Sequence, residues 1–186
     1  MMQEYFGFVL YLSSTDNEAL IPIITRLQRE YCEKPPLEPH LSIYHSVKMT
    51  SLEDTIAAVT KATKNIKSFT VESEGFGFQN TWSRILYIKI KPNPILESIR
   101  KDIGNELGDN ENRVFTPHIS LMYKDELAAT DRAKIISNLD LPATYTIRGI
   151  QIVSPGSSND DWRDYSKWKV LHSLAFSKAS STSASY

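Results

Sequence analysis

The sequence predicts an α+β protein made of two similar halves that face each other across one cleft. Three observations lead to this prediction. Strand-like and helix-like segments alternate along the chain. The strings EPHLSIY (38–44) and TPHISLMY (116–123) nearly repeat each other, and their histidines are 78 residues apart, since 118 minus 40 is 78. Other segments of the two halves align when they are shifted by the same 78 residues. Any two alternating halves can be slid into register, but here both strings containing histidine and serine fall on one shift. We therefore expect one unit, strand-helix-strand-helix-strand, to occur twice.

The first half is expected to contain three strands and two helices. Its strands are short runs rich in apolar and aromatic residues, and its helices have apolar residues three and four positions apart. Ser51 with Asp54 has the pattern of a capping box, and Pro22 is expected near the first turn of its helix. The expected elements are a strand over 6–12, a helix that follows the cap-like residues 15–17 and runs to 31, a strand over 40–44, a helix over 51–62 and a strand over 69–78.

The second half follows the same order. Asn93 and Pro94 suit the N-cap and first position of a helix, and Gly108 suits its end. The expected elements are a strand over 84–90, a helix over 94–107, a strand around His118, a helix over 130–139 and strands over 145–153 and 168–176. We expect one bilobal domain over 1–178, followed by a disordered tail over 179–186, which has little apolar surface to offset its ordering entropy.

Composition and charge exclude several functions. A formal net charge of -1 gives no broad field for gripping a long polyanion, so any nucleic-acid partner is expected to be short. The single cysteine, Cys32, excludes an internal disulfide and a zinc site built from cysteines, and it fits a reducing compartment. No apolar stretch approaches the roughly 20 residues that span a membrane, and the N-terminus lacks the layout of a secretion signal. We expect a cytoplasmic monomer.

The repeated strings carry the candidate chemistry. Successive side chains of a strand alternate between its faces, so His40 and Ser42 project together, as do His118 and Ser120, while the apolar residues between them face the core. His45 has the opposite parity and is expected at the surface. A single buried histidine is more often structural, but two such pairs meeting across a cleft would supply an acid, a base and two phosphate-binding hydroxyls. No metal ligands are evident beside either histidine, so the sequence predicts metal-free phosphoester chemistry.

The strings PHLSIY and PHISLMY resemble the paired H-x-[ST] motifs of the 2H phosphoesterase superfamily. The second string and the late segment SKWKVLHSLAF are most similar to the plant and fungal cyclic phosphodiesterases, which share this superfamily with bacterial 2'-5' RNA ligase-like proteins. The resemblance implies two antiparallel sheets that form a central cleft, with helices outside, and no cofactor. It also implies hydrolysis of ADP-ribose 1'',2''-cyclic phosphate to ADP-ribose 1''-phosphate, and of nucleoside 2',3'-cyclic phosphates to 2'-phosphates.

The same resemblance implies roles for four residues. His118 would activate water and His40 would protonate the departing oxygen, although the symmetry of the motifs makes these two roles look interchangeable. Ser42 and Ser120 would hold the phosphate.

Two aromatic residues match positions near the ligand in the cyclic phosphodiesterases. They are Tyr123, whose parity is opposite to that of His118, and Trp168; a core role is the alternative for each. The polar loop over 154–167, which contains Trp162, is expected to be either a flap over the cleft or a plain solvated connection.

Two other functions stay open. One is a 2'-5' RNA ligase-like protein or an RNA-end phosphodiesterase, which predicts a basic track leading from the cleft. The other is a module that binds a phosphate or an RNA end without catalysis. The expected partner is a small cyclic phosphate, a nucleotide or an RNA end with a 2',3'-cyclic phosphate.

Overall fold

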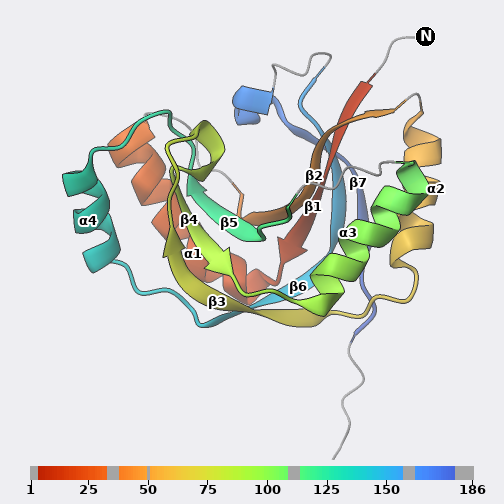
Figure 1. The fold of residues 1–186 in the computed structure, drawn as a ribbon, viewed down its shortest axis with the longest axis horizontal. Helices are drawn as coiled ribbons and strands as arrows, with labels where there is room; N and C mark the ends of the chain where they lie inside the picture. The colour runs from red at the N-terminus through yellow and green to blue at the C-terminus, as the bar shows by residue number, and fades with distance from the viewer. Residues whose placement is uncertain (1–3, 33–37, 50, 109–113, 157–161, 179–186) are drawn as a thin grey trace, which may run out of the picture.

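The computed structural model describes residues 4–32, 38–49, 51–108, 114–156 and 162–178. In these residues the chain forms four α-helices and seven strands, and the strands pair antiparallel (Figure 1). The elements in chain order are β1 (Glu4–Leu12), α1 (Ser14–Leu27), β2 (His40–Met49), α2 (Leu52–Thr63), β3 (Phe69–Gly77), β4 (Leu86–Ile90), α3 (Pro94–Leu107), β5 (His118–Met122), α4 (Ala129–Ser137), β6 (Thr144–Ser154) and β7 (Lys169–Ala175).

The predicted α+β class is confirmed, and the strands expected in two sheets are joined into one. The order in the sheet is β1-β2-β5-β4-β3-β6-β7, and β1 also pairs with β6. The first six strands therefore close into a ring of hydrogen-bonded neighbours, to which β7 is added. Figure 1 shows α1 and α4 together on one side of this curved sheet and α2 and α3 on the other, so the helices lie outside it as expected.

Two strand contacts join equivalent positions of the two halves. Where β2 meets β5, Leu41 pairs with Ile119, and where β3 meets β6, Phe69 pairs with Ile147. In both pairs the residue numbers differ by 78 (119 minus 41 and 147 minus 69). An approximate twofold axis through these two pairs would exchange the halves, and the strands that carry the candidate histidines meet at one end of that axis.

The caps of α2 and α3 form as predicted. Ser51 Oγ accepts a hydrogen bond from the backbone N–H of Asp54 at 3.2 Å. Asn93 Oδ1 accepts from the N–H of Ile95 at 2.9 Å. Gly108 ends α3 with a φ of 70°, a left-handed conformation that glycine adopts without steric cost.

Helix α1 begins earlier than predicted. Its N-cap is Ser13, whose Oγ accepts from the N–H of Asp16 at 3.2 Å, so the residues expected as the cap lie in the first turn. Pro22 therefore lies inside the helix and not near its first turn, where it leaves one backbone carbonyl of the preceding turn without its usual N–H donor. A short π-helical segment over Gln28–Cys32 continues the chain beyond α1.

The remaining boundaries differ by a few residues. Arg84, expected in a strand, belongs to a 3-10 turn over Trp82–Arg84, and β2 continues to Met49 beyond the expected end at 44. The predicted tail, 179–186, lies outside the described residues, as does the 157–161 part of the predicted loop. None of the helices in the described part of the chain is long and apolar enough to cross a membrane.

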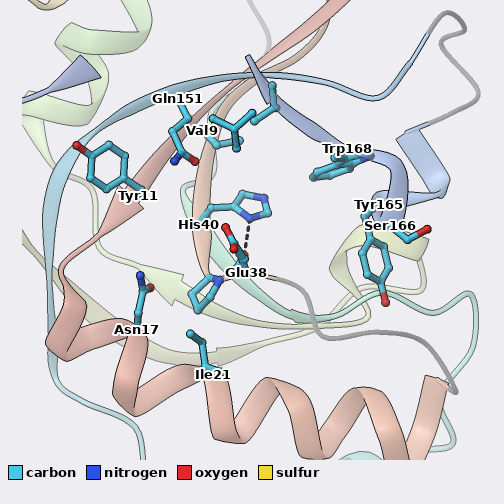
Figure 2. A pocket seen from close by; sticks show the side chains of 13 residues that line it. Val9, Tyr11, Asn17, Ile21, Glu38, His40, Gln151, Tyr165, Ser166 and Trp168 are labelled. Carbon is cyan, nitrogen blue, oxygen red and sulfur yellow. Dashed lines mark hydrogen bonds between the residues drawn. The ribbon is translucent and has the colours of Figure 1, made fainter. Parts of the chain in front are cut away.

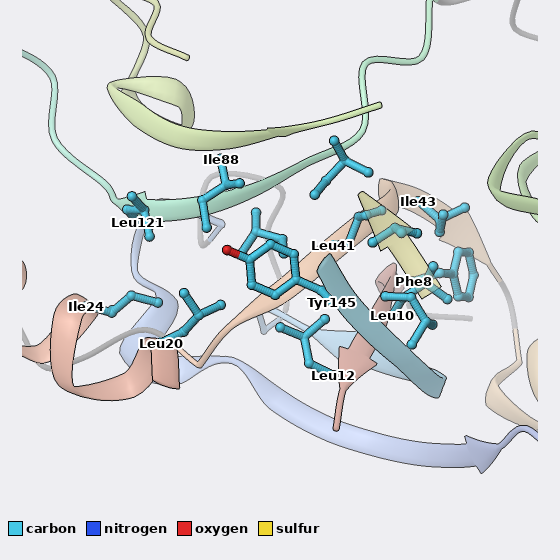
Figure 3. Close-up of a cluster of buried hydrophobic side chains, with 14 of the residues drawn as sticks. Phe8, Leu10, Leu12, Leu20, Ile24, Leu41, Ile43, Ile88, Leu121 and Tyr145 are labelled. Atoms are coloured by element: carbon cyan, nitrogen blue, oxygen red, sulfur yellow. The ribbon is translucent and has the colours of Figure 1, made fainter. Parts of the chain in front are cut away.

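The core fills the space between the sheet and the helices (Figure 3). Leu41 and Ile43 of β2 are 0% and 2% exposed, and Ile119 and Leu121 of β5 are both 0% exposed. The alternation predicted for these two strands is therefore correct on the apolar side. Burying such side chains is worth about 1.5–3 kcal/mol each, which fixes the register that presents the candidate residues.

Candidate active site

Both candidate histidines are held by the same backbone contact. His40 Nδ1 lies 2.8 Å from the carbonyl oxygen of Glu38, and His118 Nδ1 lies 2.9 Å from that of Thr116. A carbonyl only accepts, so Nδ1 carries the proton in each ring, and Nε2 of the neutral imidazole is left to accept one. In each string a proline separates the two residues and favours an extended conformation for the residue before it, which explains why a proline precedes each histidine.

The pKa of each imidazole is lowered, but the neighbouring charges differ. Burial is the main cause of the lowered His118 pKa of about 4; the Thr116 carbonyl opposes this shift, and the charges of Arg84 and His40 add to it. Burial also lowers the pKa of His40, while the Glu38 carbonyl and carboxylate raise it. Near neutral pH both rings of the free protein are therefore uncharged. A carboxylate favours protonation of His40, and a guanidinium disfavours protonation of His118.

The two histidines line adjacent cavities that share one wall. His118, Ser42 and Tyr123 line the larger cavity, of about 790 Å³. His40 lines the smaller one, of about 470 Å³. Trp168 lines both, and its ring centroid is 6.0 Å from that of His40. Trp168 is thus the lining residue that the two cavities share, and the strand pattern could not place it.

Figure 2 shows the smaller cavity, with the imidazole of His40 near its centre and Trp168 beside it. Its other walls carry the uncharged polar side chains of Tyr11, Asn17 and Gln151. Tyr11 has room because residue 149 is glycine: a Cβ there would lie 2.4 Å from the Tyr11 hydroxyl oxygen. The described lining on the His40 side therefore mixes polar and apolar side chains, with one carboxylate, Glu38, and no Lys or Arg.

The two serines differ in their surroundings. Continuing the antiparallel register of Leu41 and Ile119 by one residue in each direction brings Ser42 level with His118 and Ser120 level with His40. Ser42 lines the larger cavity together with His118. Ser120 is 5% exposed and donates to the carbonyl of Ser83 at 2.9 Å. The structure thus brings one of the predicted hydroxyls to a cavity wall and buries the other behind it.

Tyr123 is both a core residue and part of the cavity wall. It follows the last residue of β5, so the alternation that would turn it away from His118 no longer applies. Its side chain is 4% exposed, hydrogen bonds with Ser120, and lies with its ring centroid 4.5 Å from that of Trp82. Burial raises its pKa, so the hydroxyl stays protonated.

Trp162 packs against Trp168. Its ring centroid is 5.1 Å from that of Trp168, and both residues line the larger cavity. A Cβ at Gly7 would lie 2.5 Å from the Trp162 ring, so that glycine leaves room for the indole. The indole N–H groups of Trp162 and Trp168 are buried without a hydrogen-bond partner among the described residues.

Sequence reasoning missed the cations of the larger cavity. Lys48, Arg84, Arg100 and Arg163 line it, and none of the described lining residues is Asp or Glu. They come from β2, the 3-10 turn, α3 and the segment before β7, so no linear pattern marks them. His45 is exposed, as expected, and it also lines this cavity. Simple alternation does not hold around it, since the pairing of β2 with β1 shifts register on both sides of the Phe8–Tyr44 pair.

A metal site is not evident in this arrangement. Within the described part of the chain, no group of three or more His, Cys, Asp or Glu side chains could hold a metal ion. The expectation of metal-free chemistry remains a prediction, to be tested with a chelator.

Comparison with known proteins identifies the family. The chain belongs to the 2'-5' RNA ligase superfamily, whose family model matches residues 18–159. The resemblance inferred from the two histidine motifs is thereby confirmed.

Individual relatives are more distant. A Kluyveromyces lactis protein named 2',3'-cyclic-nucleotide 3'-phosphodiesterase is 27% identical over 131 residues, which cover 62% of this chain and 61% of that relative. The crystal structure of Escherichia coli LigT in apo form matches with a TM-score of 0.62 at 15% identity, over 96% of this chain and all of LigT. The crystal structure of TT0787 of Thermus thermophilus matches with a TM-score of 0.59 at 16% identity, over 94% of this chain and 98% of that one. These two similarities show the fold alone.

Proposed function

We propose that this chain is a metal-independent cyclic phosphodiesterase that opens nucleoside 2',3'-cyclic phosphates to 2'-phosphates, with His40 and His118 as acid and base. One observation carries the proposal. The two imidazoles are fixed by equivalent Nδ1 contacts, yet Glu38 favours protonation of one and Arg84 disfavours protonation of the other. A reaction that needs one acid and one base is served by two imidazoles whose neighbouring charges favour protonation of one ring and disfavour protonation of the other.

The roles follow from these fields. Neutral His118 accepts a proton at Nε2 from a water molecule, and the water oxygen forms a bond to phosphorus. The bond from phosphorus to the 3' oxygen breaks, and that oxygen takes a proton from Nε2 of His40. His40 must bind substrate in its protonated form, which the Glu38 carboxylate and the anionic phosphate both favour. The product is a 2'-phosphate, and one proton has passed from His40 to the 3' oxygen.

The phosphate is placed where the two cavities meet, beside Trp168. Ser42 and Arg84 line the cavity on the His118 side and supply hydrogen bonds to the equatorial oxygens, where charge grows in the transition state. Ser120 acts from behind, because its hydroxyl already donates to Ser83 and bonds with Tyr123. Tyr123 and Trp168 form the aromatic wall against which a ribose or base packs.

The name of the Kluyveromyces lactis relative supports a 2',3'-cyclic phosphate as substrate. ADP-ribose 1'',2''-cyclic phosphate presents the same kind of five-membered cyclic phosphate, and the resemblance to cyclic phosphodiesterases makes it the second substrate to test.

Product analysis tests the proposal. The purified chain is mixed with each of the four nucleoside 2',3'-cyclic phosphates and with ADP-ribose 1'',2''-cyclic phosphate in excess chelator, and the products are separated by chromatography. The expected products are nucleoside 2'-phosphates and ADP-ribose 1''-phosphate. Formation of 3'-phosphates, loss of turnover on chelation, or no turnover of any cyclic phosphate would contradict it.

A second candidate is an RNA-end phosphodiesterase or a 2'-5' RNA ligase-like activity. It is favoured by the four cations of the larger cavity, which supply the basic track that this function predicts. The third candidate is a module that binds a phosphate or an RNA end without catalysis. It predicts that replacing either histidine leaves ligand affinity largely intact and that no cyclic phosphate is turned over.

A further inference from the structure

The larger cavity is strongly cationic although the whole chain has a formal net charge of -1. Arg163 is paired with Asp125. The other three cations, Lys48, Arg84 and Arg100, take part in none of the ion pairs between described residues. Cations gathered in a partly desolvated hollow repel one another and stabilise a bound anion. Three unpaired cations are more than one scissile phosphate needs.

Arg100 is the most rigidly placed of the three. Its Nη1 donates to the carbonyl of Ile43 at 2.7 Å, and its guanidinium lies 4.6 Å from the ring centroid of Tyr44 and 5.0 Å from that of Phe115. The Tyr44 hydroxyl donates back to the Arg100 carbonyl at 3.1 Å. One of five guanidinium N–H groups is thus used, and the planar group is held in place with its other donors available for a phosphate.

The cations are distributed along the cavity. Arg84 lies at the His118 end, where its Nη1 donates to Thr116 Oγ1 at 2.7 Å. Arg100 is anchored to Ile43, the neighbour of Ser42, and Lys48 lies five residues further along β2 than Ile43. Aromatic rings of the same cavity, Tyr44 and Phe115, lie beside this line. Cations in a row with aromatic rings between them suit a phosphate backbone with stacked bases.

We propose that Arg100, with Lys48 beyond it, forms a second phosphate subsite, so that the substrate carries a further phosphate next to the cyclic one. This inference rests on the proposed function, because that function places the first phosphate beside Ser42 and His118. The substrate class is then an RNA end of two or more nucleotides in preference to a mononucleotide. A diphosphate such as that of ADP-ribose offers the same chemistry and is distinguished below.

The test is a binding measurement that does not depend on turnover. Dissociation constants are measured for uridine 2'-phosphate, for the dinucleotide uridylyl-uridine 2'-phosphate, and for ADP-ribose 1''-phosphate, at fixed ionic strength. The wild type is expected to bind the dinucleotide about tenfold more tightly than the mononucleotide, and Arg100→Gln to abolish that preference, since one charge-assisted contact is lost. If ADP-ribose 1''-phosphate shows the preference and the dinucleotide does not, the RNA assignment is overturned in favour of a diphosphate.

Two further variants separate a subsite from a structural effect. Arg132 of α4 is a matched control: it donates to the carbonyl of Leu127 at 3.2 Å and lies 4.0 Å from the ring centroid of Phe78, but it lines neither cavity. Arg132→Gln should keep the dinucleotide preference, whereas Lys48→Gln, at an exposed strand position, should reduce it.

If Arg100→Gln weakens the binding of all three ligands equally, or leaves the preference for the dinucleotide unchanged, the second subsite is refuted. Failure of the wild type to bind uridine 2'-phosphate would instead refute the first site and the proposed function with it. Binding without hydrolysis would leave the subsite standing and refute only the catalytic proposal.

Discussion

Ser42 of β2 and His118 of β5 line the same cavity, and the pairing of Leu41 with Ile119 brings them level. Each imidazole therefore stands opposite the serine of the other half and not only beside the serine of its own string. A phosphate bound between these strands, as we propose, would be contacted by both halves, so damage to either half should impair the same reaction.

Replacing either histidine with alanine is expected to lower kcat for nucleoside 2',3'-cyclic phosphates roughly 10² to 10⁴-fold, because a positioned acid or base is removed. His172→Ala is the control, since His172 lies in β7 and lines neither cavity. Rates are measured by chromatography of the 2'-phosphate. A histidine variant with the wild-type rate would show that this ring takes no part in proton transfer.

The pH dependence of kcat/KM should be bell-shaped with an optimum below neutral pH. Activity needs neutral His118, so it is lost as the pH falls through about 4, the pKa of that ring in the free protein. Activity also needs protonated His40, whose pKa lies below 6.5, so it declines as the pH rises through that lower value. A profile that keeps rising above pH 7 would exclude His40 as the acid.

Arg84→Gln should lower kcat/KM at every pH, because a donor to the phosphate is lost, and should shift the acidic limb of this profile but not the alkaline one. Removing the guanidinium raises the pKa of His118, so the loss of activity on acidification begins at a higher pH. Glu38→Gln should move the alkaline limb to lower pH, because the carboxylate that raises the pKa of His40 is gone. Initial rates measured across the pH range check both predictions. A shift of the alkaline limb in Arg84→Gln and of the acidic limb in Glu38→Gln would reverse the assignment of acid and base.

Stability should also fall with acidification. In the unfolded chain His118 binds a proton near pH 6.5, whereas in the folded protein it does so near 4, so protonation below 6.5 favours unfolding. Urea unfolding curves should show a loss of unfolding free energy as the pH falls from 6.5 towards 4. His118→Gln should flatten the part of that loss which belongs to this ring, and an equally steep loss would assign it to other groups.

Tyr145→Phe should leave the fold as stable as the wild type or stabilise it by up to about 1 kcal/mol. Tyr145 is fully buried in the core shown in Figure 3, and its hydroxyl has no hydrogen-bond partner among the described residues. Tyr165→Phe is the matched comparison, because the Tyr165 hydroxyl donates to Gln28 Oε1 at 3.0 Å. Chemical denaturation should show a loss of about 1 kcal/mol for the second variant only.

Much of the fold could be predicted from the sequence because local signals and burial agree there. The caps at Ser51, Asn93 and Gly108 follow from side-chain and backbone preferences that act within a few residues. The faces of β2 and β5 follow from alternation. Alternation fails where a strand bulges or ends, which is why Tyr123 lines the larger cavity and why His45 lines it too, although His45 is exposed as expected.

The cationic cavity and the contact of Trp168 with His40 could not be predicted from local patterns, for a different reason. Arg84, Arg100 and Arg163 are brought together by packing between distant segments, and the net charge of the chain averages over such clusters. Trp168 precedes a strand that pairs with β6, so its contact with His40 depends on the closure of the sheet. The repeated strings did predict that Ser42 and His118 lie together, and the resemblance placed Tyr123 and Trp168 near the ligand. The roles of the two histidines remain a prediction.

The pairing of Leu41 with Ile119 has an evolutionary consequence. A single unit of this kind supplies one imidazole and one serine hydroxyl, so an ancestor made of one unit would have needed a second copy to complete a site, and its two histidines would have been identical. In a single polypeptide the two copies can differ: a glutamate beside one ring and an arginine beside the other, as at Glu38 and Arg84, require copies that are encoded separately. The unequal surroundings of the two histidines are thus available to a chain that holds both units and not to a pair of identical ones.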